Sequence, residues 1–317
     1  METLELYGGK VRLSFEPGKH KYRVQIGEEI LKPPSVTTVT GLLDKSGPLT
    51  QWAANQTAQY VREHLLVENS TWELSQIERL LEEARFRFRE VKAEAASIGS
   101  QAHAFLEDYQ RTILTGQRSL SDFIEETASL EERVKRSVEA GIKWLGKHNV
   151  KPLMIERSIY SIRFNYAGRL DKTAEVDGKY CIVDWKTGKE IYEEFILQIA
   201  AYAEAIDEED GRFPEGAWLV RLGKETGEFE AHWIGGEDLR KAFIGFSSLL
   251  DVYNWRKGWR EKLREEKKDA KSQVRASEGG ERGGCVVGEM VRDRGEEGRD
   301  SGGLEVQMAP GGEASGA

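Results

Sequence analysis

The sequence predicts an α/β or α+β domain with a helical region ahead of its sheet. Apolar residues spaced three and four apart run through about 50–148, as in amphipathic helices. Short alternating or apolar segments typical of strands follow over about 150–235, interrupted by one helical segment, EEFILQIAAYAEAI. A last helical pattern occupies about 237–272. This order predicts helices packed on a sheet around one core.

Each element has its own local signal. VRLSF and KYRVQIGEE, separated by the turn EPGKH, predict an N-terminal β-hairpin that Pro33 and Pro34 end. One helix is expected from about Ser121 to His148, where Gly-Lys-His-Asn stops it. LMIERSIYSI, AGRLDKTAEV and KYCIVDWK predict strands, and GAWLVRLG with EFEAHWIG predicts a closing hairpin.

Composition excludes several classes of protein. The chain of 317 residues has a net charge of −9, which argues against nucleic-acid binding by overall charge, although a local basic groove remains compatible with it. No apolar run approaches the ~20 residues of a membrane span, and no secretory signal is recognisable. Cys181 and Cys285 are too few and too far apart for a thiolate zinc site or an iron–sulfur cluster. A protein of a reducing cytoplasm is expected.

The strongest signal for a site is a tight hairpin. Asp177-Gly178 joins two predicted strands and favours a two-residue type I′ turn, which pairs Val176 with Lys179. In that register Asp171 lies directly opposite Asp184, with Cβ atoms about 5 Å apart on one face.

Two facing carboxylates repel each other, so the pair needs a compensating charge. A divalent cation between Asp171 and Asp184 would supply it, and oxygen ligands favour Mg²⁺ or Mn²⁺ over zinc. Lys186 lies two residues beyond Asp184 and therefore on the same face of the strand. A solvated strand end with a weak ion pair is the alternative interpretation.

These residues carry a family resemblance. G-R-L-D (168–171), D-W-K (184–186) and Q-I-A-A-Y (198–202) resemble the G-x-x-D, D/E-x-K and Q-x-x-x-Y motifs of RecB-type nucleases in the PD-(D/E)xK superfamily. The resemblance covers about 99–206 and implies a restriction-endonuclease-like fold, a mixed central sheet flanked by helices. H-K-Y-R-V and P-P-S-V-T-T-V near the N-terminus are similar to the corresponding stretch of phage-type exonucleases and of the mitochondrial genome maintenance exonuclease.

The resemblance also implies a set of metal ligands. I-G-S-Q-A-H resembles a helical G-x-x-x-H element, so His103 would be a metal ligand beside Asp171 and Asp184. The backbone carbonyl of Trp185 would complete the set. A lone helical histidine is otherwise a packing or surface residue.

Roles for the remaining motif residues follow from the same resemblance. Lys186 would position or activate the attacking water and stabilise developing negative charge. Glu156, on the strand before G-x-x-D, would support the ligands or bind a second metal ion. Gln198 and Tyr202 lie four apart on one helix face and would approach the site and bound DNA, or pack the helix on the sheet.

The implied function is hydrolysis of DNA phosphodiester bonds with Mg²⁺ or Mn²⁺. An exonuclease acting on DNA ends or single strands in replication, repair or recombination is expected, encoded by a bacterium or a phage and working beside recombination or replication proteins. An endonuclease or flap nuclease of the same fold, or a catalytically silent DNA-binding module, remains open. The cysteine content excludes the iron–sulfur branch of the family, and no membrane association is expected.

One domain is expected over 1–274, with a helical cap at 50–148, a catalytic core at 150–235 and a C-terminal helix at 237–272. The Gly-rich, charged segment 275–317 is predicted to be disordered. The segment 255–271 is basic with interleaved tryptophans, a pattern that suits DNA binding. We favour the simpler interpretation of a solvated helix whose tryptophans pack inward.

Overall fold

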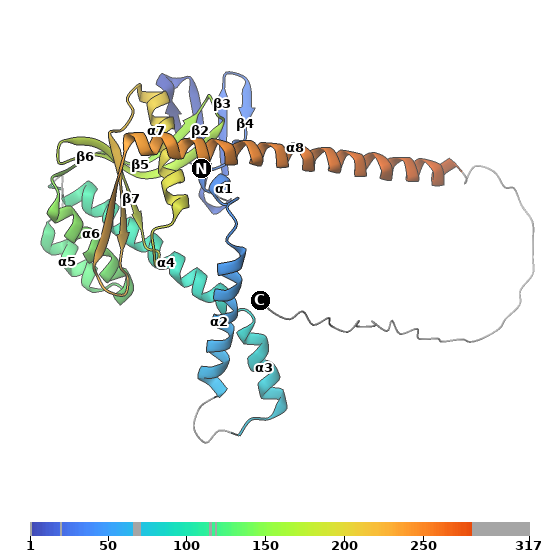
Figure 1. The fold of residues 1–317 in the computed structure, drawn as a ribbon, viewed down its shortest axis with the longest axis horizontal. Coiled ribbons are helices and arrows are strands. Elements are labelled where there is room, and N and C mark those ends of the chain that lie inside the picture. The colour runs from blue at the N-terminus through green and yellow to red at the C-terminus, as the bar shows by residue number, and fades with distance from the viewer. Residues whose placement is uncertain (1, 20, 66–70, 114–115, 118, 281–317) are drawn as a thin grey trace, which may run out of the picture. The chain divides into compact units, whose positions relative to one another are not determined.

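The computed structural model describes residues 2–19, 21–65, 71–113, 116–117 and 119–280. The chain divides into two compact units, residues 1–259 and 260–317. The first unit holds both sheets and all the predicted site residues (Figure 1). Of the segment 275–317 that was predicted to be disordered, residues 275–280 belong to a helix instead, and the residues from 281 onward lie outside the described ones.

A five-stranded mixed sheet forms the centre of the first unit. Its order is β5 (Val150–Ser161), β6 (Tyr166–Val176), β7 (Lys179–Lys186), β8 (Gly216–Leu222) and β9 (Phe229–Gly235). All neighbours are antiparallel except β7 and β8, which are parallel. A parallel pair needs a crossover connection, and helix α7 (Glu193–Asp210) supplies it. The predicted mixed sheet flanked by helices is therefore confirmed.

Helices cover both faces of this sheet. Helix α7 packs on one face against Leu170, Ile182 and Leu219. Helices α4 (Arg87–Asp108) and α6 (Glu132–Lys147) belong to the cluster on the other face, with Val183 and Val220. Since successive side chains of a strand point to opposite faces, Ile182 and Val183 serve different clusters. The central strands therefore have continuous apolar sequences, because both of their faces are buried.

The N-terminal hairpin is part of a second, four-stranded antiparallel sheet. Its order is β1 (Glu2–Leu6), β2 (Val11–Glu16), β3 (Lys21–Ile26) and β4 (Glu29–Leu31), with short helical turns at Tyr7–Gly9 and Pro17–Lys19. The predicted pairing of VRLSF with KYRVQI is confirmed, whereas β1 and β4 were not predicted. Leu13 and Val24 pack in one cluster with Tyr160 and Ala167, which fixes this sheet against β5 and β6.

The helical region contains more breaks than predicted. After α1 (Val36–Thr40) come α2 (Ser46–Leu65), α3 (Leu74–Ala84), α4, a π-helical turn (Tyr109–Ile113), α5 (Leu120–Ala128) and α6. The single helix predicted for 121–148 is wrong. Ser129 donates its hydroxyl to the carbonyl of Glu126, and the Glu131 carboxylate caps α6 by accepting from the Arg133 N–H. Two local side-chain bonds thus end one helix and begin the next.

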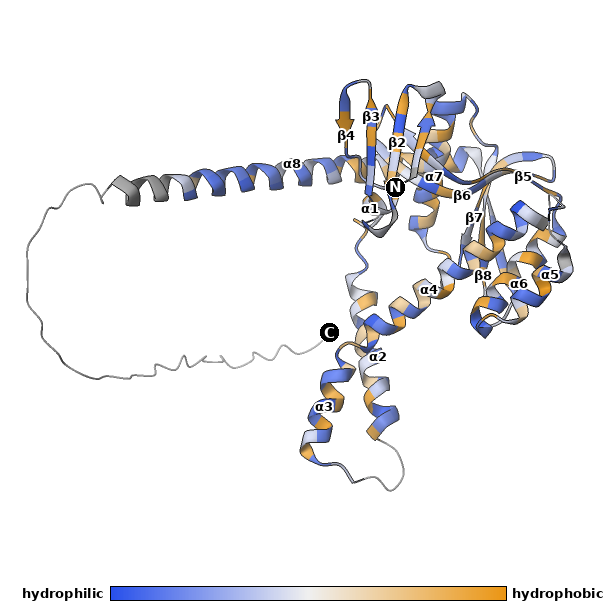
Figure 2. Cartoon of the chain, turned by 180° about the vertical axis from the view of Figure 1, so that it is seen from behind, coloured by the Kyte–Doolittle hydropathy of each residue, from blue (hydrophilic) through white to orange (hydrophobic). Residues whose placement is uncertain are grey.

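Helix α8 (Gly236–Gly280) is longer than the predicted 237–272 and is predominantly hydrophilic (Figure 2). Trp255 and Trp259 are 67% and 49% exposed, so the interpretation that they pack inward is wrong. Charged residues surround both tryptophans in sequence, and this stretch therefore has no apolar face to bury. In the described part of the chain, no helix combines the length and hydropathy that crossing a membrane requires.

Candidate active site

The β6–β7 hairpin has the predicted register. Asp177 and Gly178 both have positive φ, 51° and 83°, as a type I′ turn requires, and Val176 pairs with Lys179. Backbone pairing continues to Lys172 and Val183 and stops one step before Asp171. There the Asp171 Oδ2 accepts a hydrogen bond of 2.7 Å from the backbone N–H of Trp185. This side-chain hydrogen bond replaces the next backbone hydrogen bond of the ladder, and it holds the Asp171 carboxylate against β7.

Strand β5 is distorted where it passes Asp171. Glu156 has a φ of 56°, a left-handed conformation that is uncommon for a residue with a side chain. The β5–β6 ladder pairs Ile155 and Arg157 with β6 but skips Glu156. Backbone outliers of this kind cost of order 1–3 kcal/mol and occur frequently at functional sites. The sequence alone contained no signal for this distortion.

Asp184, Lys186, Gln198 and Tyr202 form a continuous polar chain from β7 to α7. The Nζ of Lys186 lies 2.5 Å from Oδ2 of Asp184, which is 2% exposed. The same ammonium donates to Gln198 Oε1 at 3.3 Å, and Gln198 Nε2 donates to the Tyr202 hydroxyl at 2.7 Å. The structure therefore brings these four predicted residues together.

Gly99 of the G-x-x-x-H motif and Gly168 of the G-x-x-D motif allow helices α4 and α7 to pack closely against the sheet. A Cβ at Gly99 in α4 would lie 2.7 Å from Thr187 Oγ1, and one at Gly168 in β6 would lie 2.6 Å from the Tyr202 ring. Neither position tolerates a side chain without movement of its neighbour. The close approach of α4 brings His103 Nδ1 to 3.4 Å from Asp171 Oδ1.

The two carboxyl groups have pKa values displaced in opposite directions. Burial raises the pKa of Asp184, and the neighbouring Asp171 adds to this, while Lys186 opposes it. Burial by itself would raise the pKa of Asp171 too, but the charges of His103 and Lys186 and the Trp185 N–H lower it overall. A carboxylate pair that shares one site behaves in this way.

The predicted ligands are compatible with a divalent cation but are not arranged as a preformed metal cluster. Within the described ranges, no group of three His, Cys, Asp or Glu side chains is placed to hold a metal ion. Oδ2 of Asp184 is buried, and the Lys186 ammonium lies 2.5 Å from it. The carboxylate oxygens of this set suit Mg²⁺ or Mn²⁺. The donor set fits such an ion, and its coordination stays a prediction.

A cavity of about 450 Å³ opens beside this pair of acids. Asp171, His103, Glu156 and Arg169 line it together with Phe15 and Thr187. Arg169 Nε lies 2.5 Å from Glu156 Oε2. Burial raises the pKa of Glu156, against the opposing charge of Arg169. Sequence reasoning overlooked Arg169, although its place inside G-R-L-D was an available signal.

The opposite face of the hairpin holds a buried lysine that the sequence did not single out. Lys172 is fully buried, its Nζ lies 3.9 Å from the centroid of the Trp185 ring, and it donates to Gln110 Oε1 at 2.5 Å. Burial lowers the pKa of Lys172 to about 7. The Trp185 ring also meets Trp144 edge-on, with ring centroids 5.3 Å apart. Trp185 is thus held on the face away from the acids.

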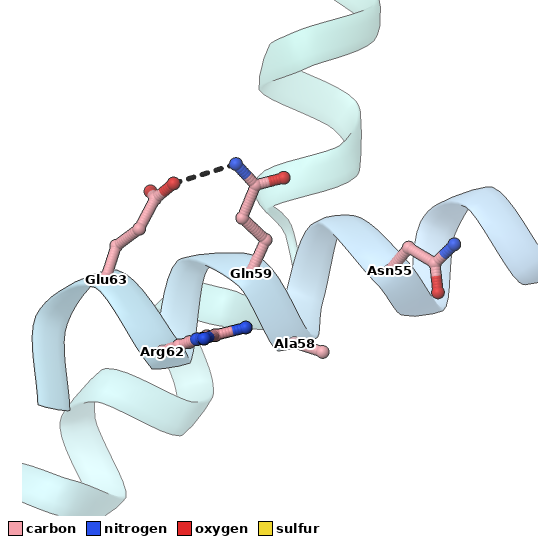
Figure 3. A pocket seen from close by; sticks show the side chains of 5 residues that line it. All are labelled: Asn55, Ala58, Gln59, Arg62 and Glu63. Atoms are coloured by element: carbon pink, nitrogen blue, oxygen red, sulfur yellow. Dashed lines mark hydrogen bonds between the residues drawn. The ribbon is translucent and has the colours of Figure 1, made fainter. Parts of the chain in front are cut away.

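A larger hollow on α2 is unrelated to these residues. It measures about 680 Å³ and is lined by one face of that helix, where Gln59 Nε2 donates to Glu63 Oε1 at 2.8 Å (Figure 3). Its lining contains none of the predicted site residues. Volume alone therefore does not locate the chemistry of this protein.

Comparison with known proteins identifies the family. No curated protein matches the chain. Among solved structures, "Crystal structure of SSO0001" matches with 12% identity and a TM-score of 0.23, covering 64% of this chain and 87% of that one. A family model described as the PD-(D/E)XK nuclease superfamily matches residues 69–286, which is more than half of the chain. This protein belongs to the PD-(D/E)XK nuclease superfamily.

Proposed function

We propose that this protein is a metal-dependent deoxyribonuclease of the RecB-like group, similar to phage-type exonucleases, that hydrolyses DNA from ends or along single strands. One observation carries the proposal: Asp171, in the middle of β6, is bound to the Trp185 N–H at the end of β7, between Asp184 and Lys186, which contact each other. Superfamily membership supports nuclease chemistry with a divalent ion and DNA as the substrate. The order of the G-x-x-D, D-x-K and Q-x-x-x-Y motifs supports the RecB-like assignment.

Asp171, Asp184 and His103 would hold Mg²⁺ or Mn²⁺, with the backbone carbonyl of Trp185 as a further ligand. Such an ion, when bound, lowers the pKa of its water and neutralises charge on the scissile phosphate. The support for this role is the buried Asp184 carboxylate, whose pKa is raised by burial and by the neighbouring Asp171.

Lys186 would stabilise the negative charge that develops on the phosphate. The Lys186 ammonium, which lies 2.5 Å from Asp184, would donate to a phosphate oxygen or to the attacking water. Gln198, itself bound to Tyr202, accepts from Lys186 and would keep that ammonium pointed at the reacting atoms.

Arg169 and Glu156 share the cavity with Asp171. The guanidinium of Arg169 is suited to bind a phosphate oxygen of the substrate in two-point fashion. Glu156 would orient Arg169 or bind a second metal ion. The support is their contact of 2.5 Å on the wall of that cavity.

The nuclease domain would span 1–274, with the helical region 50–148 guiding DNA to the site. Helix α4, which belongs to that region, already supplies His103. An exonuclease of this kind acts in replication, repair or recombination, together with the proteins of those processes.

The experiment compares end-labelled linear single strands, linear duplexes and closed circles, each incubated with the full chain and Mg²⁺ or Mn²⁺. Loss of the linear substrates with intact circles is the expected result and identifies an exonuclease. Cleavage of circles makes the protein an endonuclease. Binding of DNA without cleavage of any substrate would overturn the proposal in favour of a catalytically silent binding module.

A further inference from the structure

A second cavity, of about 580 Å³, lies between the N-terminal sheet, the segment 32–38 and Tyr253 of α8. We call it the basic groove, because Lys19, Lys21, Arg23 and Lys32 line it. The whole chain carries a net charge of −9, so this local excess of cations runs against its overall balance. None of the candidate metal ligands lines the groove.

Most of these cations form no ion pair in the described part of the chain, although Glu16 lies directly across the β2–β3 ladder from Lys21. Glu16 is the carboxylate that lines the groove, and it is bound to Lys19 at 2.8 Å. Within the described part of the chain, Lys21, Arg23 and Lys32 have no acidic partner at ion-pair distance. Three exposed cations with free donors are therefore available to an external anion.

Strand geometry explains how the cations gather. Lys21 and Arg23 alternate along β3 with Tyr22 and Val24, which are buried against the core. Because successive side chains of a strand point to opposite faces, both cations project outward from the same face. Lys32 reaches the same cavity from the end of β4.

An aromatic pair connects the basic groove with the candidate active site. Phe15 lines the 450 Å³ cavity that contains Asp171, and Tyr22 lines the basic groove. The two residues are directly paired across β2 and β3, and their rings stack with centroids 4.7 Å apart. A residue that lines one cavity is therefore in direct contact with a residue that lines the other.

We propose that the basic groove binds the phosphate backbone of the single DNA strand that continues from the candidate active site. The proposal rests on the proposed function and adds the path of the substrate to it. Lysine and arginine side chains follow a phosphate backbone without reading sequence, and the groove presents three of them that form no ion pair with the described residues.

The test removes the three free cations in a triple variant, Lys21→Ser with Arg23→Ser and Lys32→Ser. A matched control removes two lysines and an arginine that line neither cavity, Lys147→Ser with Lys179→Ser and Arg212→Ser. Binding of a labelled single strand is measured over a range of salt concentrations, with a chelator present so that no cleavage occurs. Each contacted phosphate contributes ~0.7 to the slope of log affinity against log salt for single strands.

The groove variant is expected to lose about 2 from that slope and at least ~10-fold in affinity, while the control keeps the wild-type slope. An unchanged slope in the groove variant, or an equal loss in both variants, overturns the proposal. Thermal unfolding shows whether either variant is misfolded, and Lys21→Arg with Lys32→Arg must retain the wild-type slope in a folded protein.

Cleavage separates this proposal from the proposed function. The groove variant is expected to cleave a dinucleotide at the wild-type rate and a long single strand more slowly. If the wild-type protein cleaves nothing, the nuclease assignment fails, while the slopes still decide whether the groove binds the strand. If long and short substrates are cleaved by the groove variant as by wild type, the groove has no part in the path.

Discussion

Lys186 is the residue on which the proposed chemistry depends most directly. Replacing it by methionine keeps most of the side-chain volume and removes the ammonium that lies against Asp184 and Gln198. Loss of one charge-stabilising donor typically costs ~10²–10³ in rate, so Lys186→Met should cleave DNA at least ~100-fold more slowly. The measurement is single-turnover cleavage, with metal-free circular dichroism as the check on folding. A near-normal rate would remove Lys186 from the mechanism.

A second prediction concerns Gly168, where an added side chain should destabilise the protein. A Cβ at this position would lie 2.6 Å from the Tyr202 ring and 3.1 Å from Val36, so Gly168→Ala forces the core to move. Overpacking of this kind costs about 1–3 kcal/mol of unfolding free energy. Gly146→Ala in α6 is the control, since its Cβ would meet no atom within 4 Å. Urea denaturation should show a lower unfolding free energy for Gly168→Ala and no loss for Gly146→Ala. An equal loss in the two variants would contradict the packing argument.

At the scale of elements, the docking of α4 on the sheet depends on Gly99. A Cβ there would lie 2.7 Å from Thr187 Oγ1, so Gly99→Ala should push α4 outward and move His103 away from Asp171. We expect a loss of ~1–3 kcal/mol in stability together with weaker binding of Mn²⁺. Titration calorimetry measures the binding and urea denaturation the stability.

Thr187→Ala provides the matched test of that contact. It removes the hydroxyl that a Cβ at Gly99 would meet, so the double variant should recover much of the stability that Gly99→Ala loses. Strictly additive effects of the two substitutions would show that the helix–sheet distance is set elsewhere.

Some elements could be predicted from local sequence, and others could not. The turn at Asp177-Gly178 was predicted together with its register, because positive φ values are a local property of those two residues. The break at 129–131 was missed because apolar spacing continues across it, while side-chain bonds of Ser129 and Glu131 end the regular helix. Strand β1 was missed because its burial comes from pairing with β2, not from its own composition.

For the whole molecule, the acidic pair predicts stabilisation by metal. Asp171 and Asp184 raise each other's electrostatic energy in the free protein, and a cation bound between them relieves it. Mn²⁺ at ~100 times its dissociation constant should add about 2.7 kcal/mol, a rise of several degrees in melting temperature. Asp171→Asn should lose this shift. An equal rise in the variant would place the ion elsewhere.

The sequence by itself determined the order of the motifs, the turn that sets β6 against β7, and the residue types that can hold a cation. These depend on neighbours in the chain and on the period of a strand, which are readable without coordinates. Only the tertiary structure brought His103 to Asp171, set Arg169 against Glu156, and joined the basic groove to the candidate site through Phe15 and Tyr22. These residues come close because helices and sheets pack tightly at glycines and apolar side chains that are far apart in the chain. No local sequence pattern encodes the distances between them.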